Sequence, residues 1–545
     1  MKRKSWKKAS VTTLAVALAA GSLLAACSGG GSGGKEAAAG KEGEKAPEKK
    51  PKITVTIYDR GQVPQGEGDY VNNRWTRWIN ENAPVEVEFV PVPRTGEAAK
   101  LNTLFASNTA PDLIQTYLPS YRNDLYTSKQ IIPLDDLIEK HSTNYKALMK
   151  QYPLLKKLGY KSDGKIYELG RVTGLQQNVT VVIRQDWLKK LNLDMPKTTD
   201  ELFKVMKAFA EMDPDGNGKK DTFGYNLSGN GNEVINAIFG SDTWHFDANG
   251  KLYHDYERAE AALAFKKQIY DAGIADKDYL TDKGGTKAQQ DWVNGKLGIY
   301  ASVKITSNLA LHQTFKKNNP TSEVAVLELP KGPFGQFSPQ VDTPAGSVGV
   351  VNANAKDPVA VMKYIDWLIS ESTLRTLKYG FEGEHWKMGK NGCPEPIDLE
   401  KNKKELDWNY EYYTLFGNTV LLGKCGDPSS SYDLSDPVQK ELADLYAKGK
   451  EVWLSKSRPV FKDVGFMPAL PKDLQLISTN GFKYEDLFQK AIVSGPSYTV
   501  EQAVKEAKEM WEKAGGQKVD EFYTKYYAEN KDKVYMAKID AYDIK

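Results

Sequence analysis

The sequence predicts an α/β protein with two lobes. Runs of β-branched residues alternate with stretches of helical periodicity, a rhythm typical of parallel sheets covered by helices. Roughly 495 residues follow a polar segment that ends near residue 50, and this length exceeds the usual size of one hydrophobic core. We therefore expect two domains, each built around its own sheet.

The first 27 residues have the layout of an export signal. Five basic residues precede an apolar run from Val11 to Ala20, which is typical of a signal peptide rather than of a membrane-spanning helix. Leu24-Ala25-Ala26-Cys27 resembles the bacterial lipobox, a motif whose cysteine is lipidated and becomes the new amino terminus. We expect residues 1–26 to be a signal peptide and Cys27 to be lipidated. An ordinary secretory signal is the alternative.

The segment after Cys27 has the composition of a flexible stalk. Residues 28–50 are Gly, Ser, Ala, Lys, Glu and Pro, without an aromatic residue, so they cannot bury enough apolar surface to become ordered. We assign residues 27–51 to the lipidated cysteine and this stalk. No later apolar run of about 18 residues occurs, so nothing else is expected to span a bilayer.

Strands and helices alternate in the first part of the folded region. Residues 53–58 form a β-branched run that predicts a first strand, and a loop rich in Gly and Pro follows it. Trp75, Trp78 and Ile79 have helical spacing. The alternating run 85–90 predicts a second strand, and the short apolar run 111–114 predicts a third.

The later part repeats this rhythm. Residues 179–183 predict a buried strand, and Thr198 with Glu201 forms a capping box for a helix whose apolar face includes Leu202 and Phe209. Strands are expected near 298–300 and 347–352, and Asp357-Pro358 is typical of a helix start. The region 499–527 reads as helical with a break at Gly515-Gly516.

Composition excludes several classes of function. Without the five basic residues of the signal, the net charge of +3 becomes about −2, which argues against a nucleic-acid partner. The five histidines are scattered, and HExxH and CxxC spacings are absent, so a catalytic zinc is not expected. Cys393 and Cys425 are left to pair once Cys27 is lipidated, and the sequence leaves that pairing open.

Residues 213–221 have the pattern of a calcium loop. Asp213, Asp215, Asn217 and Asp221 occupy the first, third, fifth and ninth positions, and the Lys219 carbonyl occupies the seventh. Gly224 stands where an EF-hand carries its glutamate, and the following residues look extended. We therefore expect a structural calcium site completed by Thr222 or by distant oxygens, and a solvated turn is the alternative.

The chain resembles the extracellular solute-binding lipoproteins of Gram-positive carbohydrate ABC importers (family 1 type). The resemblance covers nearly everything after the stalk, including a tail that contains Trp511. It rests on the order of these motifs: Asn108-Thr-Ala-Pro-Asp-Leu-Ile114, Asp163-Gly-Lys-Ile-Tyr167, Arg184-Gln-Asp-Trp-Leu188, Pro196-Lys-Thr-Thr-Asp-Glu-Leu202, the loop 213–221, Trp292-Val-Asn-Gly-Lys-Leu-Gly298 and Gly380-Phe-Glu-Gly-Glu-His-Trp386.

The resemblance implies a two-lobed fold of the periplasmic-binding-protein type II, with lobes joined by a hinge of several segments. The first lobe would be built by residues 52–172 and about 343–375, and the second by 173–342 and about 376–545. It also implies a monomeric, non-enzymatic receptor on the extracellular face of the cell membrane. This receptor would be held there by lipid and would pass a carbohydrate to ABC permease subunits.

Candidate ligand-binding residues lie at strand ends, where open α/β sheets bind their ligands. Sugar binding needs aromatic faces for the ring C–H groups and polar side chains for the hydroxyls. The first lobe offers Asp59, Arg60 and Tyr117. The other candidates are Asn230, Asn232, Trp244, Ser302, Lys304 and Trp386. For each of them an ordinary turn or packing residue is the alternative.

Two other functions are considered. One is a lipid-anchored glycoside hydrolase that uses Glu382 and Glu384 or Asp135 and Asp136, but neighbours in sequence do not by themselves converge on one glycosidic bond. The other is a receptor for a peptide or another polar solute. No nucleophile elbow or Walker loop is present in the sequence. Together with the resemblance, this favours a receptor of a carbohydrate, and we expect an oligosaccharide.

Overall fold

The structure is a computed structural model that describes most of the chain. The described residues are 49–242, 244–247, 249–413, 416–417, 419–460, 464–465, 467–468 and 470–542. The expected signal peptide, the lipidation site Cys27 and nearly all of the stalk lie outside them. Residues 50–545 form one compact unit. Within the described residues, no helix is long and apolar enough to cross a membrane.

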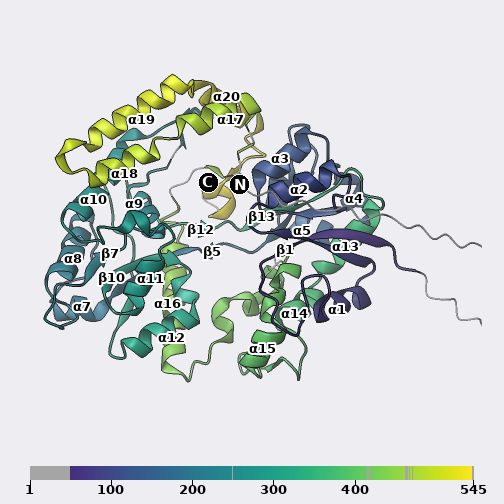
Figure 1. The fold of residues 1–545 in the computed structure, drawn as a ribbon, viewed down its shortest axis with the longest axis horizontal. Coiled ribbons are helices and arrows are strands. Elements are labelled where there is room, and N and C mark those ends of the chain that lie inside the picture. Colours follow the sequence, from purple (N-terminus) through teal and green to yellow (C-terminus); the bar gives the residue numbers. More distant parts are fainter. Residues whose placement is uncertain are drawn as a thin grey trace, which may run out of the picture. The chain divides into compact units, whose positions relative to one another are not determined.

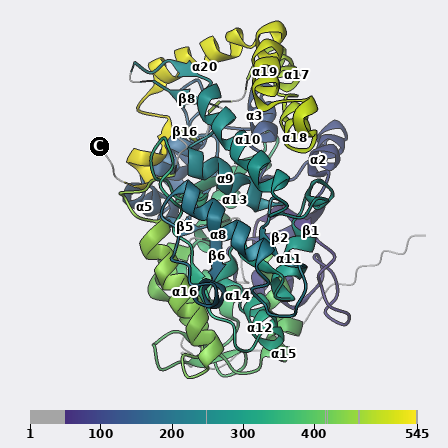
Figure 2. The same cartoon turned by 90° about the vertical axis from the view of Figure 1, so that its left-hand side faces the viewer.

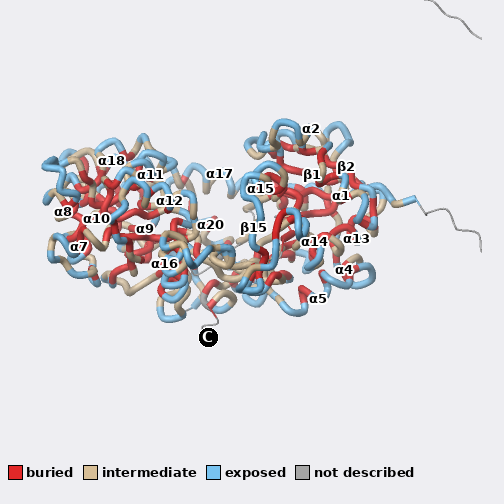
Figure 3. Tube along the Cα trace, turned by 90° about the horizontal axis from the view of Figure 1, so that it is seen from below, coloured by how far each residue is buried: buried red, intermediate tan, exposed pale blue. Residues whose placement is uncertain are grey.

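Buried side chains gather into two large hydrophobic cores. The first includes Ile53 and Val350, and the second includes Val181 and Ile299. Figure 3 shows these two groups of buried residues at opposite sides of the unit, with less buried chain between them. Each core belongs to one lobe (Figure 1), so the expected two-lobed α/β architecture is confirmed.

A five-stranded sheet forms the centre of the first lobe. Strand β1 is parallel to β2 and β3, with Ile53 opposite Val87 and Val55 opposite Leu113. The fourth strand in the sheet, β13, is antiparallel to both of its neighbours. The order across the sheet is β2 (Glu86–Pro93), β1 (Lys52–Asp59), β3 (Leu113–Gln115), β13 (Ala345–Val351) and β4 (Leu169–Val172). The four strands expected in this lobe therefore exist.

A four-stranded sheet forms the centre of the second lobe. Strand β6 is buried along its whole length, as its run of β-branched residues predicts, and it is antiparallel to β10 and β11. Strand β10 is parallel to β7. The order is β11 (Val324–Val326), β6 (Val179–Arg184), β10 (Leu297–Val303) and β7 (Phe223–Tyr225).

Both sheets are therefore mixed, whereas the sequence predicted parallel sheets. The antiparallel strands have a common origin. Strand β13 follows β12 (Val341–Asp342) and β6 follows β5 (Gln176–Gln177), and β5 pairs with β12 in a ribbon between the two lobes. A strand that enters a sheet from this ribbon runs away from the other lobe. The neighbouring strands β1, β3, β4, β7 and β10 therefore have their carboxyl ends at the edge that faces the other lobe.

Helices cover the sheet of the first lobe. In α1 an Asn73 capping box starts the helix, and Trp75 and Ile79 are buried at the predicted helical spacing. The helices are α1 (Arg74–Asn82), α2 (Glu97–Ala106), α3 (Pro119–Thr127), α4 (Asp135–His141), α5 (Asn144–Gln151), α6 (Leu154–Gly159), α13 (Pro358–Leu368), α14 (Glu371–Tyr379) and α15 (Leu399–Glu405).

Helices also cover the second sheet, and Figure 2 shows α8 and α10 on the side of this lobe that is turned away from the first. The Thr198 and Glu201 capping box starts α8, which buries Leu202 and Phe209 as predicted. The helices are α7 (Gln185–Lys190), α8 (Thr199–Glu211), α9 (Asn230–Phe239), α10 (Tyr256–Asp271), α11 (Thr286–Val293), α12 (Leu309–Asn318), α16 (Pro437–Trp453), α18 (Glu485–Val493) and α19 (Val500–Ala514).

A smaller aromatic cluster joins the last helices. Trp511 and Tyr523 pack with Leu252 there, between α19, α17 (Lys472–Gly481) and α20 (Gln517–Asn530). The remaining short elements are β8 (His245–Phe246), β9 (Leu252–Tyr253), β14 (Trp386–Met388), β15 (Pro394–Pro396), β16 (Val464–Gly465), β17 (Tyr535–Met536), η1 (Tyr279–Thr281), η2 (Ile305–Ser307), η3 (Asp407–Tyr412), η4 (Thr419–Gly426), η5 (Pro428–Ser431), η6 (Gly495–Ser497) and η7 (Ala537–Ala541).

The expected lobe boundary near residue 376 needs a correction. Leu377, Trp408, Tyr412 and Phe416 are buried in the first core, although residues 376–545 were assigned to the second lobe. The cause is packing between distant segments, because the Tyr412 hydroxyl donates to the Tyr70 carbonyl at 2.8 Å. The chain returns to the second lobe with α16, whose Tyr446 carbonyl accepts a hydrogen bond from a ribbon residue, Gln177.

A disulfide closes part of this returning segment. Cys393 and Cys425 are bonded, with Cα atoms 5.3 Å apart and a sequence separation of 32. The bond joins the hairpin of β14 and β15 to η4, which packs against α14. The pairing that the sequence left open is therefore present.

Candidate functional site

The carboxyl ends of the first sheet carry two stacked tyrosines. Tyr58 lies at the end of β1, and Tyr117 follows β3. Their ring centroids are 5.7 Å apart and their planes differ by 4°. The backbone N–H of Tyr117 donates to the Tyr58 hydroxyl at 3.1 Å. Tyr58 is buried and Tyr117 is half-buried, so Tyr117 is the more accessible of the two rings.

Guanidinium groups surround these rings. Arg94, which directly follows β2, lies 5.0 Å from the ring centroids of both Tyr58 and Tyr117. Arg171 of β4 lies 5.6 Å from the Tyr117 ring. Arg60, directly after β1, lies 5.5 Å from the ring of Tyr410. Cation–π contacts of this kind hold planar donor groups beside aromatic faces.

Two buried carboxylates hold the arginines. Glu411 is 1% exposed and forms an ion pair with Arg60. Burial raises the pKa of Glu411, although the positive charge of Arg60 acts in the opposite direction. Glu97 is also buried, accepts a hydrogen bond from the Thr116 hydroxyl at 2.7 Å and lies 3.9 Å from Arg94. The cluster thus combines aromatic faces, donors and acceptors.

The sequence found only part of this cluster. Arg60 and Tyr117 were expected, and Arg94 is recoverable by the same rule because it directly follows a strand. Glu411 carries no local signal, since 351 positions separate it from Arg60. Asp59, which was also expected, accepts a hydrogen bond from the Gly61 N–H at 2.9 Å and so stabilises its own turn.

In the second lobe, the loop after β7 is fixed to the neighbouring strand. The side chain of Asn226 donates to the Ala301 carbonyl at 3.0 Å and accepts from the Ala301 N–H at 2.9 Å. The Ser228 hydroxyl donates to Asp282 at 2.8 Å. These contacts place the start of α9, with Asn230 and Asn232, at the lobe-facing edge that the sequence predicted.

Ser302 and Lys304 lie at the same edge, at the end of β10. The Lys304 ammonium is 3.2 Å from the carboxylate of Asp342 in β12, so this lysine contacts the ribbon between the lobes. The Ser302 carbonyl accepts a hydrogen bond from the Thr180 hydroxyl at 3.5 Å. Both predicted residues are at a strand end, and Lys304 links the second sheet to the ribbon.

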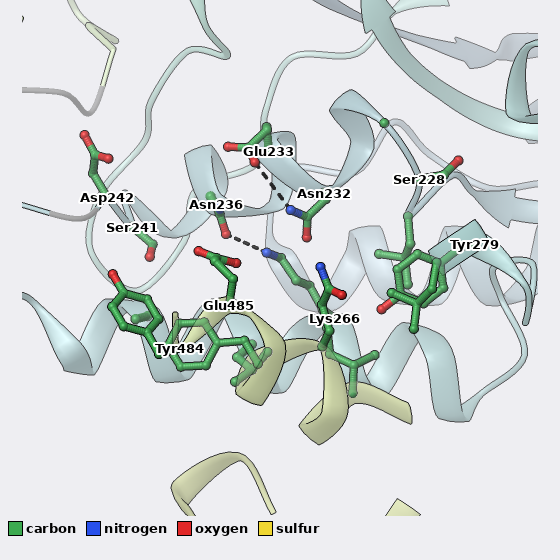
Figure 4. A pocket seen from close by; sticks show the side chains of 18 of the residues that line it. Ser228, Asn232, Glu233, Asn236, Ser241, Asp242, Lys266, Tyr279, Tyr484 and Glu485 are labelled. Atoms are coloured by element: carbon green, nitrogen blue, oxygen red, sulfur yellow. Dashed lines mark hydrogen bonds between the residues drawn. The ribbon is translucent and has the colours of Figure 1, made fainter. Parts of the chain in front are cut away.

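A pocket of about 550 Å³ lies beside this edge, between α9, α10 and α18. Asn232, the only expected site residue in its lining, enters from the first turn of α9. Figure 4 shows Glu233 and Asn236 on the same helix, Lys266 entering from α10 and Glu485 from α18. The sequence did not predict this pocket, because helices distant in sequence form it.

The two tryptophans proposed for sugar stacking are packing residues. Trp386 is 6% exposed, and its indole N–H donates to the Gly380 carbonyl at 3.1 Å, so its ring cannot serve as an open stacking surface. Trp244 is half-buried, with ring centroids 5.2 Å from those of Phe482 and Tyr523. The prediction for Trp386 is wrong because the ring is buried within its own segment, and the Trp244 ring packs against later segments of the chain.

The predicted calcium loop is folded around its acidic side chains. Asp213 has φ +47° and accepts hydrogen bonds from the N–H groups of Gly216, Asn217 and Gly218 at 3.0–3.1 Å. The Asn217 amide donates to Asp215 at 2.8 Å and to Asp221 at 3.0 Å. The Lys219 N–H donates to the Asn217 side-chain oxygen at 2.8 Å.

The carboxylates of this loop are close enough to perturb one another. Burial, the adjacent carboxyl of Asp213 and the charge of Asp221 raise the pKa of Asp215. The ammonium of Lys296 lies 2.9 Å from Asp221. Thr222, one of the expected additional ligands, instead donates its hydroxyl to the Phe209 carbonyl at 2.7 Å. The strand β7 follows, as the sequence predicted.

A second group of acidic and imidazole side chains takes part in packing contacts. In Glu384, His385 and Glu405, one possible ligand atom from each lies within 4.8 Å of the others. His385 Nδ1 accepts a hydrogen bond from the Phe381 N–H at 3.1 Å, so the ring hydrogen is on Nε2. Arg74 donates to Glu405 at 2.5 Å, and Lys401 lies 3.1 Å from Glu384. These contacts stabilise packing between α1 and α15.

Three bacterial proteins are similar in sequence to this chain. The polygalacturonan/rhamnogalacturonan-binding protein YtcQ of Bacillus subtilis is 26% identical over 515 residues, which are 90% of this chain and 94% of YtcQ. Lipoprotein LipO of the same species is 27% identical over 68% of this chain and 72% of LipO. The fructooligosaccharide ABC transporter substrate-binding protein FusA of Streptococcus pneumoniae is 31% identical over 44% of this chain and 46% of FusA.

Solved structures share the fold. FusA in complex with kestose has a TM-score of 0.62 and 21% identity, and the match covers 88% of this chain and 99% of that chain. An EF-hand mutant of FusA in complex with fructo-nystose has a TM-score of 0.65 and 22% identity over the same shares of the two chains. The alginate-binding protein AlgQ2 without calcium ion has a TM-score of 0.63 and 18% identity, covering 88% of this chain and 98% of AlgQ2.

The family model described as bacterial extracellular solute-binding protein matches residues 78–379, more than half of the chain. The matched region contains the whole second sheet, the first sheet except β1, and the ribbon between the lobes. This chain therefore belongs to the family of bacterial extracellular solute-binding proteins.

Proposed function

We propose that this protein captures an oligosaccharide outside the cell and delivers it to the membrane permease of an ABC importer. The observation that carries the proposal is the Tyr58–Tyr117 pair with its surrounding guanidinium groups. The C–H faces of sugar rings pack on aromatic rings, and sugar hydroxyls exchange hydrogen bonds with guanidinium and carboxylate groups. This cluster supplies all three kinds of contact.

The relatives support a saccharide as the cargo. YtcQ is described as binding polygalacturonan and rhamnogalacturonan, and FusA as binding fructooligosaccharide for an ABC transporter. The two descriptions differ in the sugar but agree in ligand class. We therefore propose a carbohydrate of several units rather than a peptide or another polar solute.

The two lobes act as a clamp. The strand ends of the first sheet bind one side of the saccharide, and the loop at Asn230 and Asn232 binds the other. The β5–β12 ribbon is the hinge, and contact of both lobes with one ligand favours the closed state. The closed protein then presents a surface to the permease that the open protein lacks. It acts as a monomer and without catalysis.

A lipid on Cys27 holds the receptor at the extracellular face of the cell membrane. The lipobox-like residues before this cysteine support the anchor. A flexible segment of about 25 residues spans a few tens of ångströms as a coil, which is enough for the receptor to collect solute and still reach a permease.

The loop at Asp213 binds calcium in a structural role. Its carboxylates lie close enough to raise the pKa of Asp215, and a divalent cation would stabilise their ionised forms. Asp213, Asp215 and Asp221 would supply carboxylate oxygens and Lys219 its carbonyl. Asn217 would supply its side-chain oxygen after a half-turn of its amide group. The loop lies between α8 and β7, so the ion would stabilise the second lobe rather than contact the cargo.

A thermal-shift screen tests the proposed function. A ligand that binds only the native state raises the melting temperature in proportion to the logarithm of its excess over the dissociation constant. We expect oligosaccharides of the fructan, glucan and galacturonan types to include at least one that raises Tm, and peptides to have no effect. Stabilisation by peptides without stabilisation by any saccharide would overturn the proposal.

Product analysis separates the receptor from a glycoside hydrolase. Of the expected carboxylates, Asp135 accepts a hydrogen bond from the Ile166 N–H at 3.0 Å and Glu384 contacts Lys401, so both serve local packing. We expect no new reducing ends when the stabilising saccharide is incubated with the protein. Their release, and its loss in a Glu411→Gln variant, would show hydrolysis in the same cluster.

A further inference from the structure

The pocket between α9, α10 and α18 contains a buried lysine. Lys266 is 7% exposed, and its ammonium donates to the Asn236 side-chain oxygen at 2.7 Å. An ammonium carries three donors. Among the described residues, no carboxylate lies within ion-pair distance of Lys266, so this cation has hydrogen-bonding capacity that faces the pocket (Figure 4).

Two carboxylates face the same space without pairing with the lysine. Glu233 enters from α9 and Glu485 from α18, and the negative charge of each acts to raise the pKa of Lys266. Burial lowers the pKa of Lys266 to about 8, more strongly than these two carboxylates raise it. Burial also raises the pKa of Glu485. The charged forms of both groups are therefore poorly solvated in the protein alone.

The charge and shape of the lining define the class of ligand. Carboxylates outnumber ammonium groups, since Glu233, Asp242, Asp255 and Glu485 line the pocket with Lys266 and Lys283. This balance disfavours an anion. Phe488 and Tyr256 add apolar surface, and about 550 Å³ lies within the range of small-ligand pockets. A neutral ligand with many hydroxyls suits such a lining, because each hydroxyl both donates and accepts.

The pocket is continuous with the strand-end loop of the second lobe. Ser228, Gly229 and Asn232 belong to that loop and also line the pocket. The positive φ of Gly229 (+55°) lets the chain turn there next to Gly285, where a side chain would meet the Gly285 backbone at 3.2 Å. The loop at the lobe-facing edge is therefore also a wall of the pocket.

We propose that this pocket is a subsite for one or two neutral sugar units at an end of the oligosaccharide, and this inference rests on the proposed function. Lys266 donates to a hydroxyl or ring oxygen, and Glu485 and Glu233 accept hydrogen bonds from hydroxyls. The subsite makes affinity depend on chain length, because a short saccharide bound at the Tyr58–Tyr117 cluster leaves it empty.

Calorimetric titration of a length series tests the subsite. The probes are purified saccharides of two to six units from the type that stabilises the wild-type protein. The variants are Lys266→Met and Glu485→Gln. Lys267→Met is the control, because Lys267 is the next residue on α10 and pairs with Asp271 at 3.2 Å, outside the pocket. Methionine retains the volume of the lysine stem, so the fold is expected to persist.

We expect wild-type protein and Lys267→Met to gain affinity with saccharide length, and both pocket variants to lose roughly ten-fold or more of affinity for the longest saccharide only. Unchanged affinity for the whole series in a folded Lys266→Met or Glu485→Gln protein would overturn the subsite. An equal loss at every length would also overturn it. If wild-type protein binds no saccharide, the proposed function fails, and the subsite with it.

Discussion

Tyr58 and Tyr117 stack with their ring planes 4° apart, although 59 positions separate them in the chain. The parallel pairing of β1 and β3 produces this relationship, because it brings the two carboxyl ends to the same edge of the sheet. Arg94 lies 5.0 Å from both ring centroids. Tyr117 and Arg94 follow strands that pair with β1, and this pairing holds them beside the buried ring of Tyr58.

Replacement of Tyr117 by alanine is expected to weaken oligosaccharide binding roughly ten- to hundred-fold, because the accessible face of the stack is removed. Calorimetric titration measures the effect. Tyr126→Ala is the control, since Tyr126 is a half-buried tyrosine of the same lobe that packs on Tyr167 at 4.9 Å between centroids. Equal affinities of Tyr117→Ala and wild-type protein would show that the Tyr117 ring is not part of the binding site.

The calcium loop predicts a metal-dependent melting temperature. Calcium is expected to raise Tm by several degrees in the chelated wild-type protein, and Asp215→Asn is expected to abolish this rise because it removes one of three carboxylates. Asp136→Asn is the control, since this carboxylate is exposed on α4. A calcium response that persists in Asp215→Asn would place the ion elsewhere.

The buried Lys266 predicts an unusual dependence of stability on pH. Its pKa is about 8 in the folded protein, because burial opposes the charged form, and 10.5 is its ordinary value. Between these values the unfolded chain binds more protons, so the contribution of Lys266 to folding becomes more favourable as pH rises from 8 to 10.5. The full change is on the order of 3 kcal/mol.

Denaturant unfolding of wild-type protein and Lys266→Met at pH 7, 8, 9 and 10 measures this contribution. Tyrosines and other lysines titrate in the same pH range. Their contributions cancel in the difference between the unfolding free energies of the two proteins. We expect the stability of wild-type protein relative to the variant to increase with pH. A constant difference would mean that Lys266 is solvated better than its burial implies.

The disulfide between Cys393 and Cys425 is expected to stabilise the segment that returns to the first lobe. A disulfide between residues with a sequence separation of 32 lowers the entropy of the unfolded chain. In the chain-entropy description this stabilises the folded protein by about 3–4 kcal/mol. Reduction, or replacement of both cysteines by serine, should lower the free energy of unfolding by that order and leave saccharide affinity nearly unchanged. A large loss of affinity would place the hairpin of β14 and β15 at the binding site.

Local signals in the sequence predicted much of the fold. The Thr198–Glu201 capping box and the apolar face of α8 are as expected, and so is the strand β6 with its β-branched residues. The sequence could not predict that β6 and β13 run antiparallel to their neighbours. Strand direction depends on which lobe the chain comes from, and no residue within the strand encodes that.

The candidate site was predicted less completely. Arg60 and Tyr117 follow strands, so the strand-end rule located them. Glu411 reaches the same cluster through packing of η3 against the first core, and Lys266 reaches its pocket through packing of α10 against α18. The prediction for Trp386 failed in a different way. This aromatic residue in a polar motif was predicted to be accessible to a ligand, but its own segment covers the ring.

The central claim is that an oligosaccharide binds between the two lobes at the Tyr58–Tyr117 cluster and is released unchanged. Calorimetric titration of the wild-type protein with the saccharide that raises Tm most, followed by analysis of the recovered sugar, tests it most directly. We predict one molecule bound per chain, weakened by Tyr117→Ala, and recovery of the intact saccharide. Absence of binding by every saccharide of the panel, or recovery of cleaved products, would contradict the account.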